Sequence, residues 1–319
     1  MNQKKTTKEI IAFLSDNVIY IFFVVMFMIC AVSSSYFLKS GNIGNMLRQN
    51  TSTTVMALGM LLVILTGGID LSIGGVVALT NVVFAMLLTE AQMGLGPAIV
   101  LTLVCGGACG AISGYLIAFR KMAPFIATLA MMQITRSLAF VITNAAKIKI
   151  TNQSLKGFGE GNLLGSQIKF LPNQLLPLLI ISALIICILK FTSYGRLVYA
   201  VGSNENAVVL SGVSTKGIKF SVYVISGVCA AGASILVMAR LLLATGNLGN
   251  GYELDAVAAC VIGGASLAGG RGTAGKTIIG VFVLAFIGNI MNLLGVPAYP
   301  QDIVKGVIII AAVLFQNNR

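Results

Sequence analysis

The sequence predicts an all-α polytopic membrane protein. Of its 319 residues, 57% are hydrophobic and only 9% are charged, whereas about 25% of a typical soluble domain is charged. The hydrophobic residues lie in long runs, and about 20 apolar residues in a row suffice to cross a bilayer as a helix. Most Lys and Arg residues lie between these runs. Together these observations exclude a water-soluble globular protein.

About ten transmembrane helices are expected in one compact domain, residues 1–319. The first follows a lysine-containing N-terminus, and its apolar run is longer than that of a usual signal peptide. We interpret it as an uncleaved helix, with a cleaved signal peptide ending near "AVS" at 31–33 as the alternative. The expected spans are residues 18–38, 50–66, 73–89, 97–118, 123–143, 173–190, 219–242, 255–268, 277–294 and 302–315.

The distribution of positive charge orients these helices. Because ten is an even number, both termini lie on one side of the membrane. With that side in the cytoplasm, twelve Lys and Arg residues fall in cytoplasmic segments and six in outer segments. An excess of Lys and Arg is typical of cytoplasmic loops. We therefore expect both termini in the cytoplasm, together with a long segment between the sixth and seventh spans.

Composition also excludes several classes of site. The formal charge is +12, but no basic cluster alternates with aromatic residues, so a nucleic-acid partner is not expected. The six Cys residues lie inside apolar segments without CxxC spacing, and the chain has no His. The usual zinc site and the commonest general base are therefore lacking. We expect no metal site and no catalytic residue.

The stretch "GGRGTAGKT", residues 269–277, matches the phosphate-binding pattern G-x-x-x-x-G-K-T from Gly270 onward. A functional loop of this kind leaves a buried strand and opens a helix, so that backbone N–H groups surround the phosphates. Here the stretch falls between two expected transmembrane helices. We interpret its glycines as a tight cytoplasmic turn, and we expect any ATP chemistry to reside in another chain.

The long cytoplasmic segment predicts a short helix, Asn204 to Ser211. Ser203 is a suitable N-cap, Glu205 lies in the first turn and Gly212 suits the position after the helix. So short a helix is unstable alone in water. Either its apolar residues enter a groove of a partner protein, or it rests on lipid headgroups.

Two charged residues fall inside apolar segments. Asp70 either lines a polar path or caps the helix that begins near Leu71. Arg136 lies in the middle of a span and always carries its charge. We expect it to face the protein interior or a subunit interface.

The outer segment "GNLGNGYELDAVAA" carries two more acids, Glu253 and Asp255. An ion pair with Arg240 would order a gate or contact a binding protein. A simple helix cap by either acid is an equal alternative.

Three stretches resemble the monosaccharide permeases of ABC importers, the ribose-permease type. These are "LVILTGGIDLSIGGVVALT", "GRLVYAVGSNENAVVLSGV" and "GNGYELDAVAACVIGGASLAGGRGTAGKTIIGVFVLAFIGNIMNLLGV". The resemblance extends from about residue 20 to about residue 315, with the motifs in the family's order. It implies a path formed by two permease chains, fed by an extracytoplasmic sugar-binding protein. A cytoplasmic ATPase, which binds the ATP and Mg, drives transport, and this chain holds no cofactor of its own.

The resemblance implies that the short helix couples the permease to the ATPase. The candidate coupling residues are Ser203, Asn204, Glu205, Asn206, Val208, Leu210 and Gly212. The candidates for the translocation path or gate are Asp70, Ser72, Arg136, Tyr252, Glu253, Asp255 and Asn289.

The expected function is that of a permease subunit, not an enzyme, which passes a monosaccharide across a bacterial inner or plasma membrane and contacts its lipids. Ribose is the default sugar. One competing interpretation is an ion-coupled secondary transporter of a small polar solute, but such coupling needs buried acids or His, and the spans offer little beyond Asp70. A membrane-embedded enzyme is the second competitor, and it lacks the usual catalytic groups.

Overall fold

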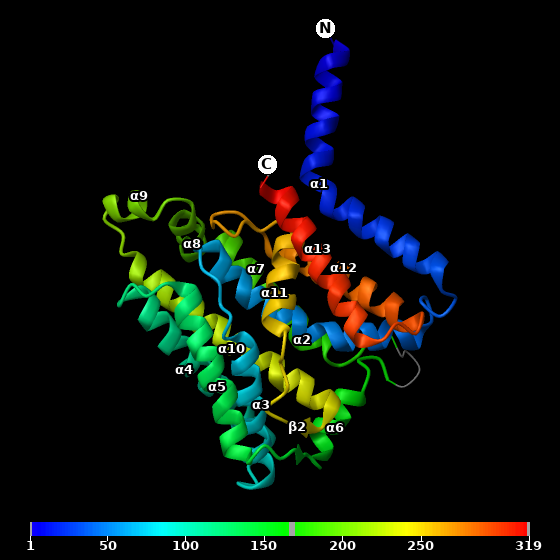
Figure 1. The fold of residues 1–319 in the computed structure, drawn as a ribbon, viewed down its shortest axis with the longest axis vertical. Helices are drawn as coiled ribbons and strands as arrows, with labels where there is room; N and C mark the ends of the chain where they lie inside the picture. Colours follow the sequence, from blue (N-terminus) through cyan, green and yellow to red (C-terminus); the bar gives the residue numbers. More distant parts are fainter. Residues whose placement is uncertain (1, 166–169, 318–319) are drawn as a thin grey trace.

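The computed structural model describes residues 2–165 and 170–317, which form thirteen helices and one two-stranded antiparallel sheet (Figure 1). The strands are β1 (Ile148–Lys149) and β2 (Leu243–Ala244). The helices are α1 (Asn2–Ser33), α2 (Ser40–Leu65), α3 (Ile73–Thr89), α4 (Leu95–Ala118), α5 (Pro124–Thr143), α6 (Gln153–Glu160), α7 (Leu175–Phe191), α8 (Ser193–Ser203), α9 (Glu205–Leu210), α10 (Thr215–Leu241), α11 (Tyr252–Ile262), α12 (Ala274–Leu293) and α13 (Ala298–Asn317). Apart from the small sheet, the all-α prediction is confirmed.

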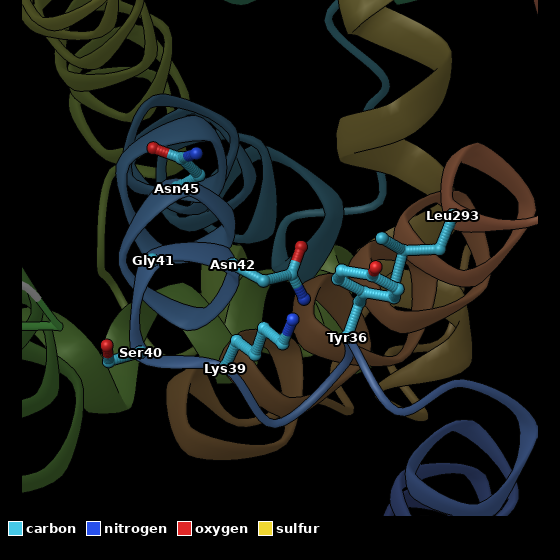
Figure 2. Close-up of a pocket in the computed structure, with 7 residues that line it drawn as sticks. All are labelled: Tyr36, Lys39, Ser40, Gly41, Asn42, Asn45 and Leu293. Atoms are coloured by element: carbon cyan, nitrogen blue, oxygen red, sulfur yellow. The ribbon is translucent and has the colours of Figure 1, made fainter.

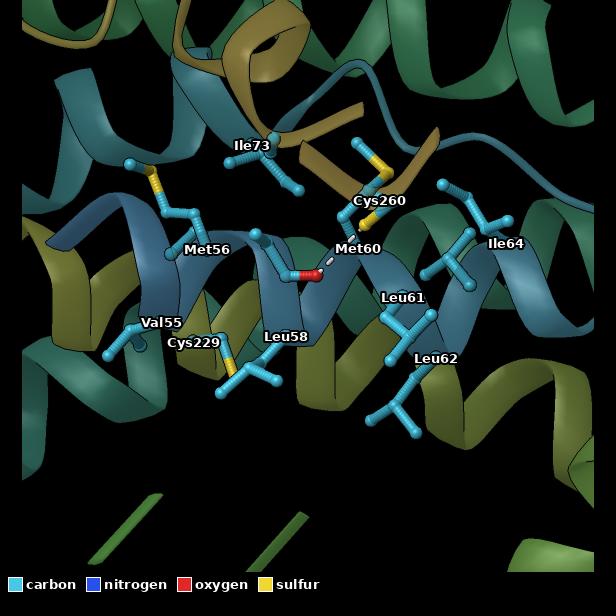
Figure 3. Close-up of a cluster of buried hydrophobic side chains, with 14 of the residues drawn as sticks. Val55, Met56, Leu58, Met60, Leu61, Leu62, Ile64, Ile73, Cys229 and Cys260 are labelled. Atoms are coloured by element: carbon cyan, nitrogen blue, oxygen red, sulfur yellow. Dashed lines mark hydrogen bonds between the residues drawn. The ribbon is translucent and has the colours of Figure 1, made fainter. Parts of the chain in front are cut away.

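Helix α2 forms the centre of the molecule. Every residue from 54 to 65 is buried, on all sides of the helix, as is typical of a helix surrounded by protein. Helices α7, α10, α11 and α12 all contact it. Figure 3 shows the apolar side chains of this cluster, in which the Cys260 thiol donates to the Ala57 carbonyl over 3.2 Å. That bond ties α11 to α2.

Helices α4 and α10 pack backbone to backbone. A methyl group at Gly106 would overlap the carbonyl oxygen of Gly227, and one at Gly110 would overlap the carbonyl oxygen of Tyr223. Small residues allow such close approach in membrane proteins, where van der Waals packing holds helices together. Among the four helices that are long and apolar enough to cross a membrane alone, α10 has the largest buried share.

Four helices are each long enough and apolar enough to cross a membrane: α4, α5, α10 and α12. The pair α7 and α8 makes a fifth if it counts as one span, although the two axes are bent by 73°. The segment Val18–Ser33 of α1 and helix α3 are shorter apolar helices. This finding, made on the described residues, confirms a multi-pass membrane protein, whereas the ten-span topology stays a prediction.

Large apolar side chains cover much of the outer surface. They are exposed on α1, α4, α5, α7 and α13. Exposure of such a surface to water would cost free energy, whereas lipid chains are as apolar as these side chains. The exposed apolar residues therefore mark the faces that contact lipid or another membrane chain.

The expected span 255–268 is wrong in its length. Helix α11 has 11 residues and ends at Ile262, so it is about 16 Å long, half of a bilayer core of about 30 Å. Gly264 follows with a φ of +82°, a left-handed conformation that ends a helix and suits glycine. Residues 263–273 form an irregular loop in place of the expected last turns.

The segment after α7, which the sequence places in the cytoplasm, contains a helix that the sequence did not predict. Thr192 accepts a hydrogen bond from the Gly195 amide over 3.1 Å and so caps α8. The bend between α7 and α8 lies at this residue. α8 then carries the chain back over the end of α2 to the start of α9.

The segment between α5 and α7 is polar in sequence but partly buried. Ile150 and Leu155 are buried in a second hydrophobic cluster, together with residues of α3 and α10. Strand β1 pairs with β2, and Asn152 caps α6 by accepting from the Leu155 amide over 3.0 Å. This segment therefore covers one end of the helices.

Candidate functional site

Helix α9 is a discrete element with a cap at each end. Asn204 accepts a hydrogen bond from the Ala207 amide over 3.0 Å and is the N-cap. The expectation that Ser203 caps this helix is wrong, because α8 continues to Ser203 and leaves the cap to the next residue. Both side chains are good caps, so the sequence alone could not choose between them.

The C-terminal end of α9 is as expected. Gly212 has a φ of +83°, which is the conformation that a glycine in this position adopts most easily. Its amide donates to the Val209 carbonyl over 3.0 Å, and the Val213 amide donates to the Val208 carbonyl over 3.3 Å. These two bonds satisfy carbonyls that the end of the helix leaves free.

The apolar residues of α9 divide between two directions. Val208 is only 8% exposed and packs within the chain. Val209 is 53% exposed and Leu210 is 88% exposed. Of the coupling candidates, Val208 therefore faces the chain itself, whereas Leu210 faces outward together with Val209. Asn206 is exposed beside them.

A polar contact holds α9 to the start of α10. Glu205 accepts hydrogen bonds from the Thr215 hydroxyl, over 2.9 Å, and from the Lys219 ammonium group. Partial burial of the carboxyl raises its pKa, but these two bonds and the positive charge of Lys219 lower it by more. The pKa of Glu205 is therefore lowered below its ordinary value.

The end of α8, just before α9, is seated on two glycine-containing loops. The Gly270 amide donates to the Leu65 carbonyl over 3.0 Å. A methyl group at Gly202 would overlap both of these groups. One turn earlier, the Tyr199 hydroxyl donates to the Gly272 carbonyl over 2.8 Å. The end of α2, the α11–α12 loop and α8 thus meet at one point, which we call the glycine seat (Leu65, Gly67, Gly202, Gly269 and Gly270).

The glycine seat accounts for the phosphate-loop pattern. Helix α11 precedes "GGRGTAGKT", so the strand of a nucleotide-binding loop is replaced by a helix in this described segment. The N–H group of Gly270 faces a carbonyl of the same chain. Thr273 accepts from the Lys276 amide over 3.4 Å and caps α12. The glycines allow close backbone contact at a turn, as expected.

Asp70 lies between α2 and α3 and is buried. One carboxylate oxygen accepts from the amide of Ser72 over 3.0 Å and from its hydroxyl, and the other accepts from the Ser226 hydroxyl on α10 over 2.7 Å. The N-cap of α3 is Ser72, and the helix begins at Ile73, so the interpretation of Asp70 as the cap of this helix is wrong. These bonds instead hold Ser72 itself, just before the helix. They also join α3 to α10.

Arg136 bonds to the loop before α11, which is expected on the outer side. Its guanidinium donates to the side-chain oxygen of Asn250 and to the Gly249 carbonyl, each over 3.3 Å. Asp70, the other charged residue within an apolar segment, bonds to Ser72 and Ser226 and not to Arg136. The charge of Arg136 is thus held within the chain, at the junction of α5 with this loop.

The acids of α11 differ from the predicted arrangement. Asp255 forms an ion pair with Lys305 on α13 at 3.2 Å, so the expected partner Arg240 is wrong. Neither Asp255 nor Glu253 is the N-cap, which is Gly251 with a φ of +80°. Tyr252, the first residue of α11, is half-buried beside them.

Glu253 is buried against the start of α3. A methyl group at Gly74 would overlap one of its carboxylate oxygens, and that oxygen has no hydrogen-bond partner in the described chain. On the opposite side of α3, a methyl group at Gly75 would overlap the Met132 carbonyl on α5. The two adjacent glycines therefore let α3 lie tightly between α5 and α11.

Asn289 joins two helices rather than projecting into open space. Its amide and that of Asn42 on α2 exchange two hydrogen bonds of 2.9 Å. Figure 2 shows Asn42 beside a surface cavity of about 540 Å³ at the beginning of α2. Its other lining residues are Tyr36, Lys39, Ser40, Gly41, Asn45 and Leu293.

Comparison with known proteins places the chain in a family. Residues 42–313 match the family described as the permease component of a branched-chain amino acid transport system. The chain belongs to this permease family. It is 40% identical to the ribose import permease protein RbsC of Escherichia coli K12 over 312 residues, which are 97% of this chain and 95% of that protein.

Further relatives of the permease cover nearly as much of its length. It is 38% identical to the ribose import permease protein RbsC of Bacillus subtilis 168, over 92% of this chain and 90% of that protein. It is 33% identical to the L-arabinose ABC transporter permease protein AraH of Azospirillum brasilense, over 93% and 86%. No solved structure matches it significantly. A permease component carries solute and is not itself an enzyme.

Sequence reasoning missed two features of the permease that lie next to α9. The Glu205–Lys219 contact joins residues on two different helices, and only their opposite charges hint at it. The glycine seat joins three segments far apart in the chain. The repeated glycine pairs were a visible signal, but glycine has too many uses for the sequence to specify their partners.

Proposed function

We propose that this permease carries a monosaccharide, with ribose as the first candidate, across a bacterial inner or plasma membrane. The proposal rests on the relatives named for ribose and L-arabinose import, which align with almost the whole chain. A cytoplasmic ATPase that binds ATP and Mg would supply energy, and an extracytoplasmic binding protein would deliver the sugar. The whole chain, 1–319, acts as one permease domain surrounded by lipid.

The observation that carries the coupling role is the exposure of Leu210. A leucine 88% exposed, on a helix capped at both ends and tied to α10, is suited to enter a groove of another protein. We propose that the ATPase provides this groove. The glycine seat then passes movement of α9 to α2 and to the α11–α12 loop, because the three backbones are in direct contact.

The ten-span topology with both termini in the cytoplasm remains our proposal, and the pairing of loops supports it. Two contacts between loops expected on the outer side each join two outer segments: β1 pairs with β2, and Arg48 donates to Asn162 and the Glu160 carbonyl. The contacts of the glycine seat join three segments expected inside. In Figure 1 both chain ends lie toward the side of α8 and α9, opposite β2 and α6.

The short α11 fits this topology as half of the eighth span. The loop that follows it packs on Leu65 and Gly202. Irregular backbone is tolerated at membrane depth only where protein or a water-filled cavity surrounds it. The eighth span is then α11 plus this enclosed loop, and α9 lies between the sixth and seventh spans.

We propose that the outer gate is formed by Arg136, Tyr252, Glu253 and Asp255. They gather where α5, α11 and α13 meet the outer loop. The remaining path candidates have structural contacts that suit a different task. Asp70 and Ser72 hold the start of α3, and Asn289 holds α12 to α2.

Uptake by the assembled transporter tests the function. The chain would be reconstituted in proteoliposomes together with its ATPase and binding protein. These vesicles should transport labelled ribose only when ATP is present on the side of the membrane that the ATPase faces. Dissipating proton and sodium gradients should leave that uptake unchanged. Uptake that follows an ion gradient and ignores ATP would instead establish the secondary transporter.

A further inference from the structure

Gln133 lies at the centre of α5 and is exposed. It is the tenth of the 20 residues of this helix, so about 15 Å separates it from each end. Helix α5 is one of the four that are long and apolar enough to cross a membrane alone. The Gln133 amide makes no hydrogen bond to another side chain or backbone group of the described residues.

Such a group is not compatible with lipid on all sides. The side-chain amide has one acceptor and two N–H donors, and transfer of an unpaired amide to an apolar medium costs about 4–8 kcal/mol. From the bilayer centre the short glutamine side chain cannot reach the headgroups, as a long Lys or Arg near a helix end can. Water, a solute or another protein chain must therefore contact Gln133.

The exposed surface of α5 has a polar edge and an apolar edge. Ser137, one turn after Gln133, is also exposed, and Arg136 beside them bonds to Asn250 in the outer loop. The opposite edge consists of the exposed residues Ile134, Leu138 and Val141. Only the polar edge leads from the centre of the helix to the outer loop, and the apolar edge suits lipid.

We propose that Gln133 lines the sugar path and forms hydrogen bonds with hydroxyl groups of the monosaccharide, with Ser137 next to it on the outer side. An amide can both donate to and accept from a hydroxyl, and a neutral polyhydroxylated solute needs both. A second copy of the chain would supply the opposite wall, since this face is open in one copy. The inference rests on the proposed function and names a residue that touches its substrate.

Thiol accessibility distinguishes a water-filled path from lipid. Gln133→Cys, Ile134→Cys and Leu138→Cys would be made in a Cys187→Ser background, because Cys187 is the exposed native cysteine. The assembled transporter in proteoliposomes would be treated with a charged, membrane-impermeant methanethiosulfonate. We expect the cysteine at 133 to react at least about tenfold faster than the two controls, and ribose with binding protein and ATP to change its rate.

Uptake supplies a second measurement that does not depend on cysteine. Gln133→Leu removes the hydrogen bonds but keeps a similar volume, and Ile134→Leu is the matched control on the apolar edge. We expect Gln133→Leu to lower Vmax/KM for ribose about fivefold to tenfold, the size of one lost hydrogen bond. Gln133→Asn should lose less, because it retains the amide. ATPase retention should be unchanged in all three variants.

The outcomes separate this inference from the proposed function. If the unmodified transporter imports ribose while the cysteine at 133 reacts no faster than that at 134 and Gln133→Leu transports normally, Gln133 faces protein or lipid and the inference is wrong. If the unmodified transporter imports neither ribose nor arabinose with ATP, the proposed function fails. Should Gln133→Cys not assemble, the rate and assembly of Gln133→Leu against Ile134→Leu decide the matter.

Discussion

The Gly270 amide donates a hydrogen bond to the carbonyl oxygen of Leu65 over 3.0 Å. Leu65 is the last residue of α2, where a helix leaves its final carbonyls without partners. Gly270 adopts a φ of +71° there, which glycine tolerates best. The bond joins the central helix to the loop after α11, and Gly202 of α8 lies against both groups. Movement of the α8–α9 segment therefore cannot occur without moving α2, this loop or the contacts between them.

Leu210→Asp should abolish both ATPase retention and sugar uptake. The change places an unpaired charge in the proposed groove. A buried charge left without its partner costs roughly 3–5 kcal/mol, so docking should weaken by roughly 100-fold or more. Because Leu210 is exposed in the chain itself, insertion into the membrane should be normal. Co-purification of the ATPase and ribose uptake measure the two effects.

Val208→Ala is the matched control for this prediction. Val208 packs within the chain, so its truncation should lower thermal stability slightly but leave the ATPase bound. Normal ATPase retention in Leu210→Asp and in the double change Val209→Asp with Leu210→Asp would refute the docking role. The interpretation of α9 as a helix resting on headgroups would then return.

Gly202→Ala should impair uptake without releasing the ATPase. The added methyl group would overlap the Leu65 carbonyl and the Gly270 amide, and overpacking of this kind typically costs about 1–3 kcal/mol. The face of α9 is unaffected, so the defect should appear as ATP hydrolysis that no longer drives transport. The ratio of ribose imported to ATP hydrolysed should fall severalfold.

Gly217→Ala provides the comparison, since Gly217 is also helical but has no atom of another segment within 4 Å of the added methyl position. That variant should transport normally and be stabilised by about 0.4–1 kcal/mol through reduced freedom of the unfolded chain. An unchanged transport ratio in Gly202→Ala, with uptake equal to that of Gly217→Ala, would show that the seat transmits nothing.

The hold of Glu205 on α10 should depend on pH. Its folded-state pKa is lowered from an ordinary value of 4.5. Its contacts therefore contribute full stability above that value, and the contribution disappears as pH falls through the folded pKa. Hydrogen exchange at residues 205–210, corrected for its intrinsic pH dependence, should rise at low pH in the unmodified protein.

Glu205→Gln should flatten this pH dependence and speed local exchange at neutral pH. The carboxylate is 41% exposed, so solvent screens the pair and the effect should be about 0.2–1 kcal/mol. Glu160→Gln, which alters an exposed acid on α6, is the control and should change neither. A pH response that persists in Glu205→Gln would assign it to another group.

The sequence predicts this fold well where its signals are local and repeated. Long apolar runs locate the expected spans, and Gly212 marks the end of α9 because its left-handed conformation favours glycine. The early end of α11 could not be predicted, since "VIGGASLA" is apolar enough to continue a span. The turn itself is closed by local bonds, from the Gly264 amide to the Val261 carbonyl and from the Ala265 amide to the Cys260 carbonyl.

The candidate sites were harder because their partners are distant in sequence. Asp255 pairs with Lys305 rather than Arg240, and nothing in either segment specifies that choice. The inward direction of Val208 was hidden for another reason. A helix of six residues is too short for a periodic pattern to distinguish its buried side from its exposed side.

Arg136→Leu should impair sugar uptake while membrane insertion survives. The guanidinium holds the Asn250 side chain and the Gly249 carbonyl, and Gly249 lies against Gly74 at the start of α3. Removing the guanidinium frees the loop before α11 and leaves two groups unpaired, at a cost of about 1–3 kcal/mol for each that stays buried. We expect ribose uptake to fall by about tenfold or more, and the apolar replacement should favour insertion.

Arg136→Lys tests whether geometry or charge matters here. A lysine retains the charge but lacks the planar fork that reaches two acceptors at once, so it should restore only part of the uptake. Full activity in both variants, with unchanged assembly of the transporter on a sizing column, would mean that the long Arg136 side chain merely reaches toward the headgroups and has no role in the interior. Partial rescue by lysine alongside loss in leucine would instead identify the loop that it holds, residues 245–251, as part of the gate.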